Sequence, residues 1–72
     1  MTNKQFVKKL GKRIIELREK KNLSQAQFSK KLKGHQGTLH KIENGAVVST
    51  VLMLRKIAKA LGVPLHKLID VK

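Results

Sequence analysis

Side chains that could bind a metal or catalyse a reaction are few and widely spaced in this 72-residue chain. It contains three histidines, four acidic residues and no cysteine. His35 and His40 are five residues apart, not the three or four that place two ligands on one helical face, and His66 stands alone. The acidic residues are scattered and form no set with a nucleophile and a base: Glu16, Glu19, Glu43 and Asp70. We therefore expect no enzymatic activity, no metal and no other cofactor.

Positive charge dominates the composition. Seventeen lysines and arginines against four acidic residues give a formal net charge of +13 at pH 7. A surface that only needs to be soluble mixes the two signs, so an excess this large favours a polyanionic partner. The chain has no Tyr or Trp, and stacking platforms for unpaired bases are therefore nearly absent. Double-stranded DNA is the predicted partner, and an anionic membrane surface or plain solubility is the weaker alternative.

The length of 72 residues predicts one domain, residues 1–72, near the lower size at which a hydrophobic core is stable without disulfides or metals. No apolar run approaches the roughly 18 residues of a membrane helix. The N-terminal residues MTNKQFVKK contain no hydrophobic stretch of signal-peptide length. We expect a soluble cytoplasmic protein with no membrane partner.

Periodicity and capping signals predict the first two helices. Apolar residues at three- and four-residue steps indicate an amphipathic helix over about 4–21, ended by Asn22. Ser24 and Gln27 then have the spacing of a capping box, in which each side chain satisfies a backbone N–H of the other residue. The second helix is expected to run to about residue 32 or 33, where Gly34 breaks it.

Three shorter helices follow, over about 35–44, 51–61 and 65–70. Gly37 within the first of them costs roughly 1 kcal/mol of helix propensity, so packing or DNA must help to hold that helix. The boundaries are set by capping and breaking residues: Gly45, Ser49 or Thr50, Gly62 and Pro64. With no strand pattern anywhere, the sequence predicts an all-α domain of five helices.

Two short helices joined by a glycine-containing turn, in a basic all-helical domain, are typical of a helix-turn-helix, here at about residues 24–44. From Leu10 to Leu68 the chain resembles the phage-repressor and Cro-like (XRE-type) family of DNA-binding domains. Four segments carry the resemblance: LREKK at 17–21, LSQAQF at 23–28, IENG at 42–45 and IAKALGV at 57–63. It implies a repressor-like fold whose second helix lies over the DNA backbone and whose third helix, about 35–43, enters the major groove.

The first turns of the second and third helices hold the main candidate DNA contacts. Gln25 begins the second helix, where amides can donate to a phosphate; the resemblance implies that contact and, in some members, a brace to the recognition helix. Gln36 is the best candidate reader, because its amide can pair with adenine N6 and N7. Thr38 can contact a phosphate or a thymine methyl group. The missing side chain of Gly37 lets the backbone approach DNA closely.

Four further residues are candidate contacts with alternatives left open. His35 either caps the third helix or contacts DNA. His40 and Lys41 either touch DNA, with Lys41 at a phosphate or a guanine, or are solvated. Asn44 meets the opposite phosphate strand, as the resemblance implies, or only forms the turn beside Gly45.

The resemblance also implies a largely buried ion pair between Arg18 and Glu43, which ties the first helix to the recognition helix. The chain departs from the family pattern at two positions. Ser29 replaces a small alanine, and its hydroxyl needs a partner if it is buried. Lys33 stands where the turn glycine is usual, and Gly34 follows one residue later, which displaces the expected start of the recognition helix by about one residue.

These observations predict a sequence-specific transcriptional regulator, and more narrowly a repressor. One monomer offers too little interface for tight specific binding, so we expect a homodimer on a pseudo-palindromic operator, with half-sites about 34 Å apart. The candidates for the dimer surface are apolar C-terminal residues, of which the first two fit a core role equally well: Leu65, Leu68, Ile69 and Val71. The alternative is a protein-interaction module, such as an antitoxin or partner-binding subunit on the same fold, suggested by the apolar Val47 and Val48.

Overall fold

The regular structure of the chain is helical throughout the residues that its computed structural model describes, which are 2–33, 36–47 and 49–71. The helices are α1 (Asn3–Lys20), α2 (Gln25–Lys31), α3 (Gln36–Glu43), α4 (Val51–Leu61) and α5 (Leu65–Leu68). The predicted all-α fold of five helices is confirmed, although α5 ends two residues before the predicted end at residue 70. None of the helices in the described ranges is long and apolar enough to cross a membrane.

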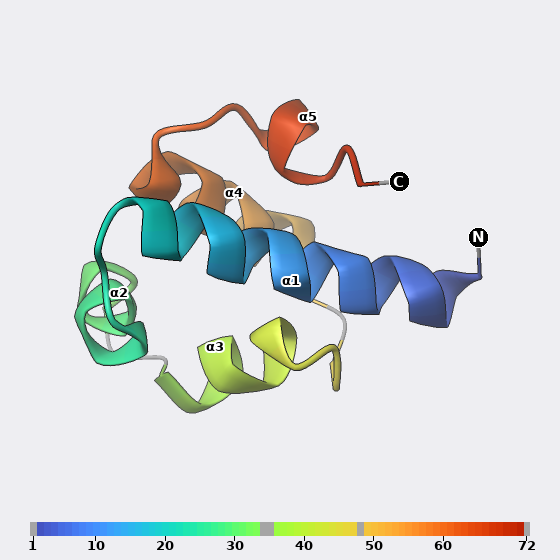
Figure 1. The fold of residues 1–72 in the computed structure, drawn as a ribbon, viewed down its shortest axis with the longest axis horizontal. Coiled ribbons are helices and arrows are strands. Elements are labelled where there is room, and N and C mark those ends of the chain that lie inside the picture. Colours follow the sequence, from blue (N-terminus) through green and yellow to red (C-terminus); the bar gives the residue numbers. More distant parts are fainter. Residues whose placement is uncertain (1, 34–35, 48, 72) are drawn as a thin grey trace.

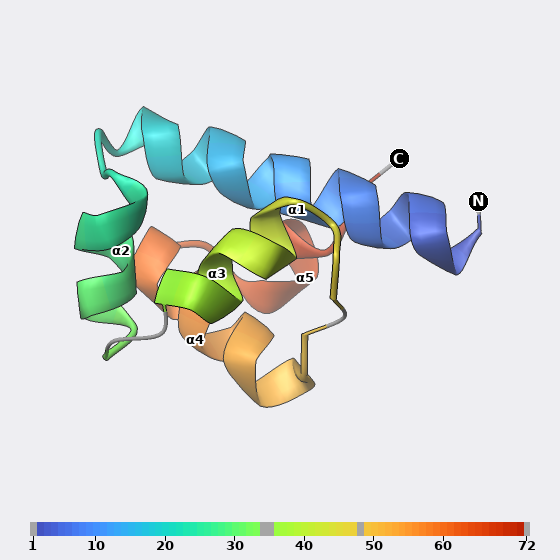
Figure 2. The same cartoon turned by 90° about the horizontal axis from the view of Figure 1, so that it is seen from below.

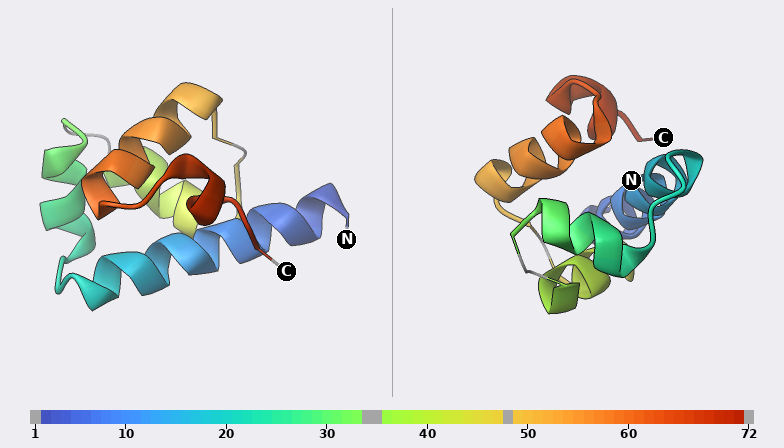
Figure 3. Two further views of the ribbon diagram at one scale, coloured as in Figure 1. Left: turned by 90° about the horizontal axis from the view of Figure 1, so that it is seen from above. Right: turned by 90° about the vertical axis from the view of Figure 1, so that its left-hand side faces the viewer.

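Helix α1 is the long element against which most of the others pack (Figure 1). It contacts α4 and α5 on one side and α3 on the other, while α2 crosses one of its ends and packs on α3. Figure 2 shows α3 on the outside of the molecule, with α1, α2 and α4 around it. After α4 the chain turns back, so that α5 lies beside α4 (Figure 3).

The core between these helices is aliphatic apart from one fully buried phenylalanine, Phe28. Its buried apolar members come from all five helices and the end of α2: Leu10, Ile14, Phe28, Leu32, Leu39, Ile42, Ile57, Ala58, Leu61 and Leu68. Leu68 is 0% exposed, so it cannot belong to a dimer surface and is removed from the four candidates. Leu65 is half-buried and packs against the core, whereas Ile69 remains 37% exposed.

Ser29, the polar departure from the family pattern in α2, is buried but satisfied. Its exposed fraction is 4%, and its hydroxyl donates to the Ala26 carbonyl at 2.9 Å. A buried hydroxyl costs stability chiefly when it lacks a partner, so this serine takes the place of a small apolar residue without an orphaned polar atom.

Side-chain caps fix where three of the helices begin. The predicted capping box of α2 is present: the Gln27 N–H donates to Ser24 Oγ at 3.0 Å, and the Ser24 N–H donates to the Gln27 amide oxygen at 2.8 Å. Thr2 and Gln5 form a second capping box at the start of α1, at 3.1 and 2.8 Å, which the sequence reading overlooked. Of the two candidates at α4, Thr50 is the cap. Each such cap contributes about 1 kcal/mol to helix stability.

Two helices end on a non-glycine residue with a left-handed backbone. Asn22, at φ +56°, follows α1, and the Asn22 and Leu23 N–H groups donate to two of the last carbonyls of that helix. Lys33, at φ +62°, follows α2. The predicted helix breaker Gly34 lies outside the described residues. Lys33 stands at the position where the resemblance implies a glycine. A lysine in this conformation costs about 1–2 kcal/mol more than a glycine.

Replacing this strained lysine is expected to stabilise the fold. Lys33→Gly should raise the free energy of unfolding by about 1 kcal/mol, because the steric cost of the left-handed backbone exceeds the extra chain entropy of glycine. Lys30→Gly, at an exposed helical residue of α2, removes the same charge and should lower it by about 1 kcal/mol. Urea unfolding followed by circular dichroism measures both; a destabilised Lys33→Gly would contradict the assigned strain.

Gly11 brings α1 and the end of α3 into direct backbone contact. It is buried, and a Cβ atom at this position would lie 2.5 Å from the Glu43 carbonyl oxygen and 2.6 Å from that of Ile42. Both obstacles are backbone atoms, which cannot move aside as a flexible side chain can. Sequence reading did not identify this glycine, although its place directly after Leu10 puts it at the edge of the buried stripe of α1.

Two glycine-to-alanine substitutions in helices should therefore act in opposite directions. Gly11→Ala gains helix propensity but overpacks the α1–α3 contact, so we expect a net loss of about 1–3 kcal/mol in the free energy of unfolding. Gly37→Ala meets nothing within 4 Å and should gain about 0.5–1 kcal/mol. Denaturant unfolding of the two variants at one pH and salt concentration makes the comparison, and equal effects would exclude the proposed backbone contact.

Candidate nucleic-acid interface

The outer surface of α3 is polar because the opposite side of the helix is held in the core. Leu39 and Ile42 are buried against α1 and α2. Apart from Glu43, which is also buried, the other positions of α3 and the residue that follows it are exposed and mostly polar, and we call them the α3 face: Gln36, Gly37, Thr38, His40, Lys41 and Asn44. It carries six of the eight residues predicted to contact DNA. Of the other two, Gln25 lies in α2 and His35 lies outside the described residues.

A buried ion pair fixes the end of α3 to α1. Arg18 Nε donates to Glu43 Oε2 at 2.8 Å and Arg18 Nη2 donates to Glu43 Oε1 at 3.2 Å, so the contact is two-pronged. The two side chains are only 12% and 2% exposed. Arg18 Nη1 also donates to the Leu23 carbonyl at 2.7 Å, which ties the α1–α2 connection to the same guanidinium. The two residues that the resemblance pairs are therefore in contact.

Gln25 connects the first residue of α2 to the same carboxylate. Its Nε2 donates to Glu43 Oε1 at 2.9 Å. Glu43 thus accepts three hydrogen bonds from two elements other than its own, and no buried side-chain nitrogen or oxygen in the described part of the chain lacks a partner. This geometry makes Gln25 a brace between the two helices of the helix-turn-helix, which is one of the two roles that the resemblance implied.

His40 and Asn44 extend this network to the exposed edge of the α3 face. Asn44 Nδ2 lies 3.0 Å from His40 Nε2, and the other ring nitrogen of His40 lies 3.5 Å from Gln25 Nε2. The end of α3 is therefore held through a chain of side chains that runs from α1 and α2 to the surface. Gly45, at φ +71°, stops the helix directly after Asn44, as predicted.

The first turn of α3 is the open end of this surface. Gln36, Gly37 and Thr38 are exposed, and the space around Gly37 is free to 4 Å. Lys41 is exposed one turn further along. Gln36 and Thr38 offer hydrogen-bonding groups to a partner bound at α3, Lys41 offers a positive charge, and Gly37 offers its backbone.

Val47, in the loop after α3, is only partly available as a contact. It is 37% exposed and lines a small cavity of about 40 Å³ together with apolar residues of α1, α3 and α4: Phe6, Val7, Leu10, Ile42 and Leu54. This gives Val47 an internal use that the sequence did not indicate. Val48 lies outside the described residues.

The Arg18–Glu43 contact generates a stability prediction. Arg18→Met leaves a buried carboxylate without its cationic partner and should lower the free energy of unfolding by about 3–5 kcal/mol. The double variant Arg18→Met/Glu43→Met removes both charges, and should recover most of that loss, because apolar pairs of similar volume often replace buried ion pairs at little cost. Urea unfolding of both variants and of Glu43→Met completes the cycle. Additive losses would show that the two residues act independently.

Comparison with known proteins gives one match. The sequence model of a helix-turn-helix family matches residues 14–68. The matched stretch begins at the buried Ile14 in the middle of α1 and ends at Leu68, the last residue of α5, so it includes the whole α2–α3 unit and the Arg18–Glu43 pair. No curated protein matches the chain significantly.

Proposed function

The chain belongs to the Cro- and phage-repressor-like (XRE-type) helix-turn-helix family of DNA-binding regulators, and we propose that it acts as a transcriptional repressor that inserts α3 into the major groove. The observation that carries the proposal is the α3 face: six exposed residues that can contact DNA, on a helix whose other side is buried and whose end is fixed by Glu43. A rigid element positions base contacts more accurately than a loop does.

Affinity and specificity come from different residues in this proposal. The net charge of +13 supplies phosphate contacts that bind any sequence. Gln36 reads an adenine with its amide, and the bare backbone at Gly37 allows α3 to approach the groove floor. Thr38 and Lys41 add contacts on either side, and Asn44 meets the phosphates beyond the helix end.

Gln25 combines both of its expected roles. A side-chain amide has two N–H donors, and one of them is used on Glu43. The second is available to His40 at 3.5 Å or to a DNA phosphate. A phosphate contact by Gln25 would therefore be coupled to the position of α3 through Glu43.

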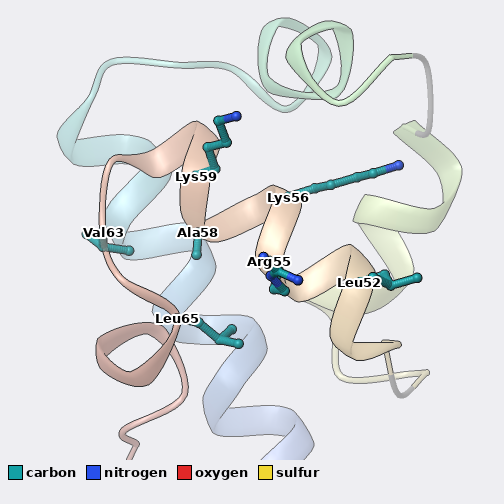
Figure 4. A pocket seen from close by; sticks show the side chains of 7 residues that line it. All are labelled: Leu52, Arg55, Lys56, Ala58, Lys59, Val63 and Leu65. Atoms are coloured by element: carbon teal, nitrogen blue, oxygen red, sulfur yellow. The ribbon is translucent and has the colours of Figure 1, made fainter.

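We further propose a homodimer on a pseudo-palindromic operator. An apolar groove between α4 and α5, lined in part by Leu52, Val63 and Leu65, supports a second copy as its occupant (Figure 4). Leu52 and its neighbour Val51 are 68% and 65% exposed. Two-fold symmetry on DNA would place two α3 helices in successive major grooves about 34 Å apart. The basic residues Arg55, Lys56 and Lys59 also line this groove, so like charges oppose the pairing until DNA screens them.

The exposed Val51 and Leu52 also support a second candidate, a protein-interaction module built on the same fold. The two functions differ in their response to salt. Binding to duplex DNA releases counterions and weakens steeply as salt rises, whereas an apolar protein complex is insensitive to it.

Selection of bound duplexes from a random pool, at stated salt, tests the function and reports the half-sites and their spacing. On the selected site, Gln36→Ala should weaken binding by about 5- to 150-fold, the loss of roughly 1–3 kcal/mol that one base contact contributes. Binding to random duplex should stay nearly unchanged. Lys41→Ala is the matched variant on the same face, and it should weaken binding to both the selected and the random duplex. Equal losses of Gln36→Ala on the two duplexes would show that Gln36 does not read sequence, and recovery of no enriched duplex would contradict specific DNA binding.

A further inference from the structure

A cationic hollow lies beside the helix-turn-helix, between the end of α2 and the second half of α4. Its volume is about 490 Å³, and four of its six lining residues are lysines: Lys31, Leu32, Lys33, Lys56, Lys59 and Ala60. No acidic residue lines it. We call it the lysine hollow.

The lysines of this hollow come from two elements that the fold brings together. Lys56 and Lys59 are three residues apart on α4 and share one face of that helix. Figure 4 shows Lys59 extending from α4 toward α2, and Lys56 extending from α4 toward the start of α3. All four lysines are exposed, and in the described part of the chain the one ion pair is Arg18–Glu43, so none of the four is neutralised there. Gathering these charges costs repulsion that no acidic side chain lining the hollow offsets.

The strained backbone of Lys33 is a second, independent observation at the same place. A glycine at φ +62° would avoid about 1–2 kcal/mol of steric cost, yet the position carries a lysine whose side chain lines the hollow. Strain that local packing does not require is a feature of functional positions. The residue type at the turn is therefore explained by its charge and not by its backbone.

We propose that the lysine hollow binds phosphate groups of the DNA backbone outside the stretch that α3 reads. The inference rests on the proposed function, because it is α3 in the major groove that holds the hollow against the same duplex. Lys33 precedes Gln36, the first residue of α3, by only three positions, so the hollow and the α3 face are close along the chain. A site tethered in this way contributes even when its own affinity is weak.

The chemistry of the hollow favours a polyanionic chain over a small anionic ligand. Lysines are flexible point charges that suit phosphates without sequence preference, whereas oriented recognition of a small anion uses fixed donors. A free anion would have to order several lysine side chains, each at a cost in rotamer entropy. The C-terminal end of α2 also turns its partial negative charge toward this region. DNA that is already bound through α3 overcomes these costs, and an isolated anion does not.

The test compares two variants that each remove two positive charges from exposed helix positions. Lys56→Gln/Lys59→Gln alters the hollow. Because both lysines also line the groove between α4 and α5, the oligomeric state of each variant, free and bound to DNA, is measured by sedimentation, and salt slopes are compared only between species of the same oligomeric state. Lys9→Gln/Lys12→Gln is the matched control on α1, where both lysines line a shallow depression beside Asp70 and on the side of α5. Glutamine keeps much of the side-chain length and the helix propensity. Circular dichroism of each variant verifies folding before DNA is added.

The readout is the slope of log Kobs against log salt concentration on a long duplex that carries the selected site. Each phosphate contact contributes about 0.9 to the magnitude of this slope. The slope of the hollow variant should therefore be smaller in magnitude than the wild-type slope by nearly 2, and the slope of the control by less than about 0.5. On a duplex trimmed to the site itself, the two variants should bind alike. The inference is overturned if the control loses as much slope as the hollow variant, or if the hollow variant keeps the wild-type slope on the long duplex.

The Lys33→Gly variant should change fold stability and DNA binding in opposite directions. It should stabilise the fold, as predicted above, and still lower the salt slope by about 0.9. A lysine with a purely structural role would change stability and leave the slope unchanged, which would remove Lys33 from the site.

Two further outcomes separate the possible failures. A wild-type protein without salt-dependent binding to any duplex contradicts the proposed function itself, whereas steep wild-type binding with an unaffected hollow variant contradicts only the inference about the hollow. Titration with inorganic tripolyphosphate, followed by the amide resonances of Leu32 and Ala60, tests the other source of phosphate. No saturable shift is expected below millimolar concentration, and a saturable one would assign the hollow to a small anion.

Discussion

The carboxylate of Glu43 is the point on which the arrangement of the helix-turn-helix depends. It is buried, and a buried charge is tolerated only when its partners are in place. Those partners come from α1, through the two-pronged contact of Arg18, and from the first residue of α2, through Gln25. One side chain therefore sets α3 relative to both neighbouring helices. Gly11 reinforces the position, because its missing side chain lets α1 approach the last carbonyls of α3.

This constraint divides α3 into a fixed end and an open end. The last turn is held by Glu43 and by the contacts among Gln25, His40 and Asn44. The first turn, with Gln36 and Gly37, has no comparable side-chain bracing in the described structure, and it follows a turn whose left-handed residue is a strained lysine. Such a division suits a helix whose end fixes the docking angle while its first turn adjusts to the bases, as the proposed function requires.

The distribution of charge also separates the inside of the protein from its proposed DNA-binding surfaces. The acidic residue most deeply buried is neutralised inside the protein, while lysines collect on the surface at the end of α2 and along α4. Self-repulsion of a +13 domain lowers the stability of the free protein, and a polyanion on the α3 face and the lysine hollow would relieve it. Stability and partner binding are in this way linked through one set of residues.

The sequence by itself determined the features that depend on neighbours along the chain. The capping box at Ser24, the helix stops at Gly45 and Gly62, and the polar outer positions of α3 each follow from residues within one or two turns, as does the box at Thr2 that was overlooked. The Arg18–Glu43 pair spans 25 positions, and only the family resemblance indicated it. Tertiary structure alone decided that Leu68 lies in the core, that Lys33 has a left-handed backbone, that Gly11 is a backbone contact, and that four lysines share one hollow. The physical reason is that apolar, small and basic residues satisfy the same local pattern whether they face a neighbouring helix or the solvent, so only the packing of distant segments distinguishes the two.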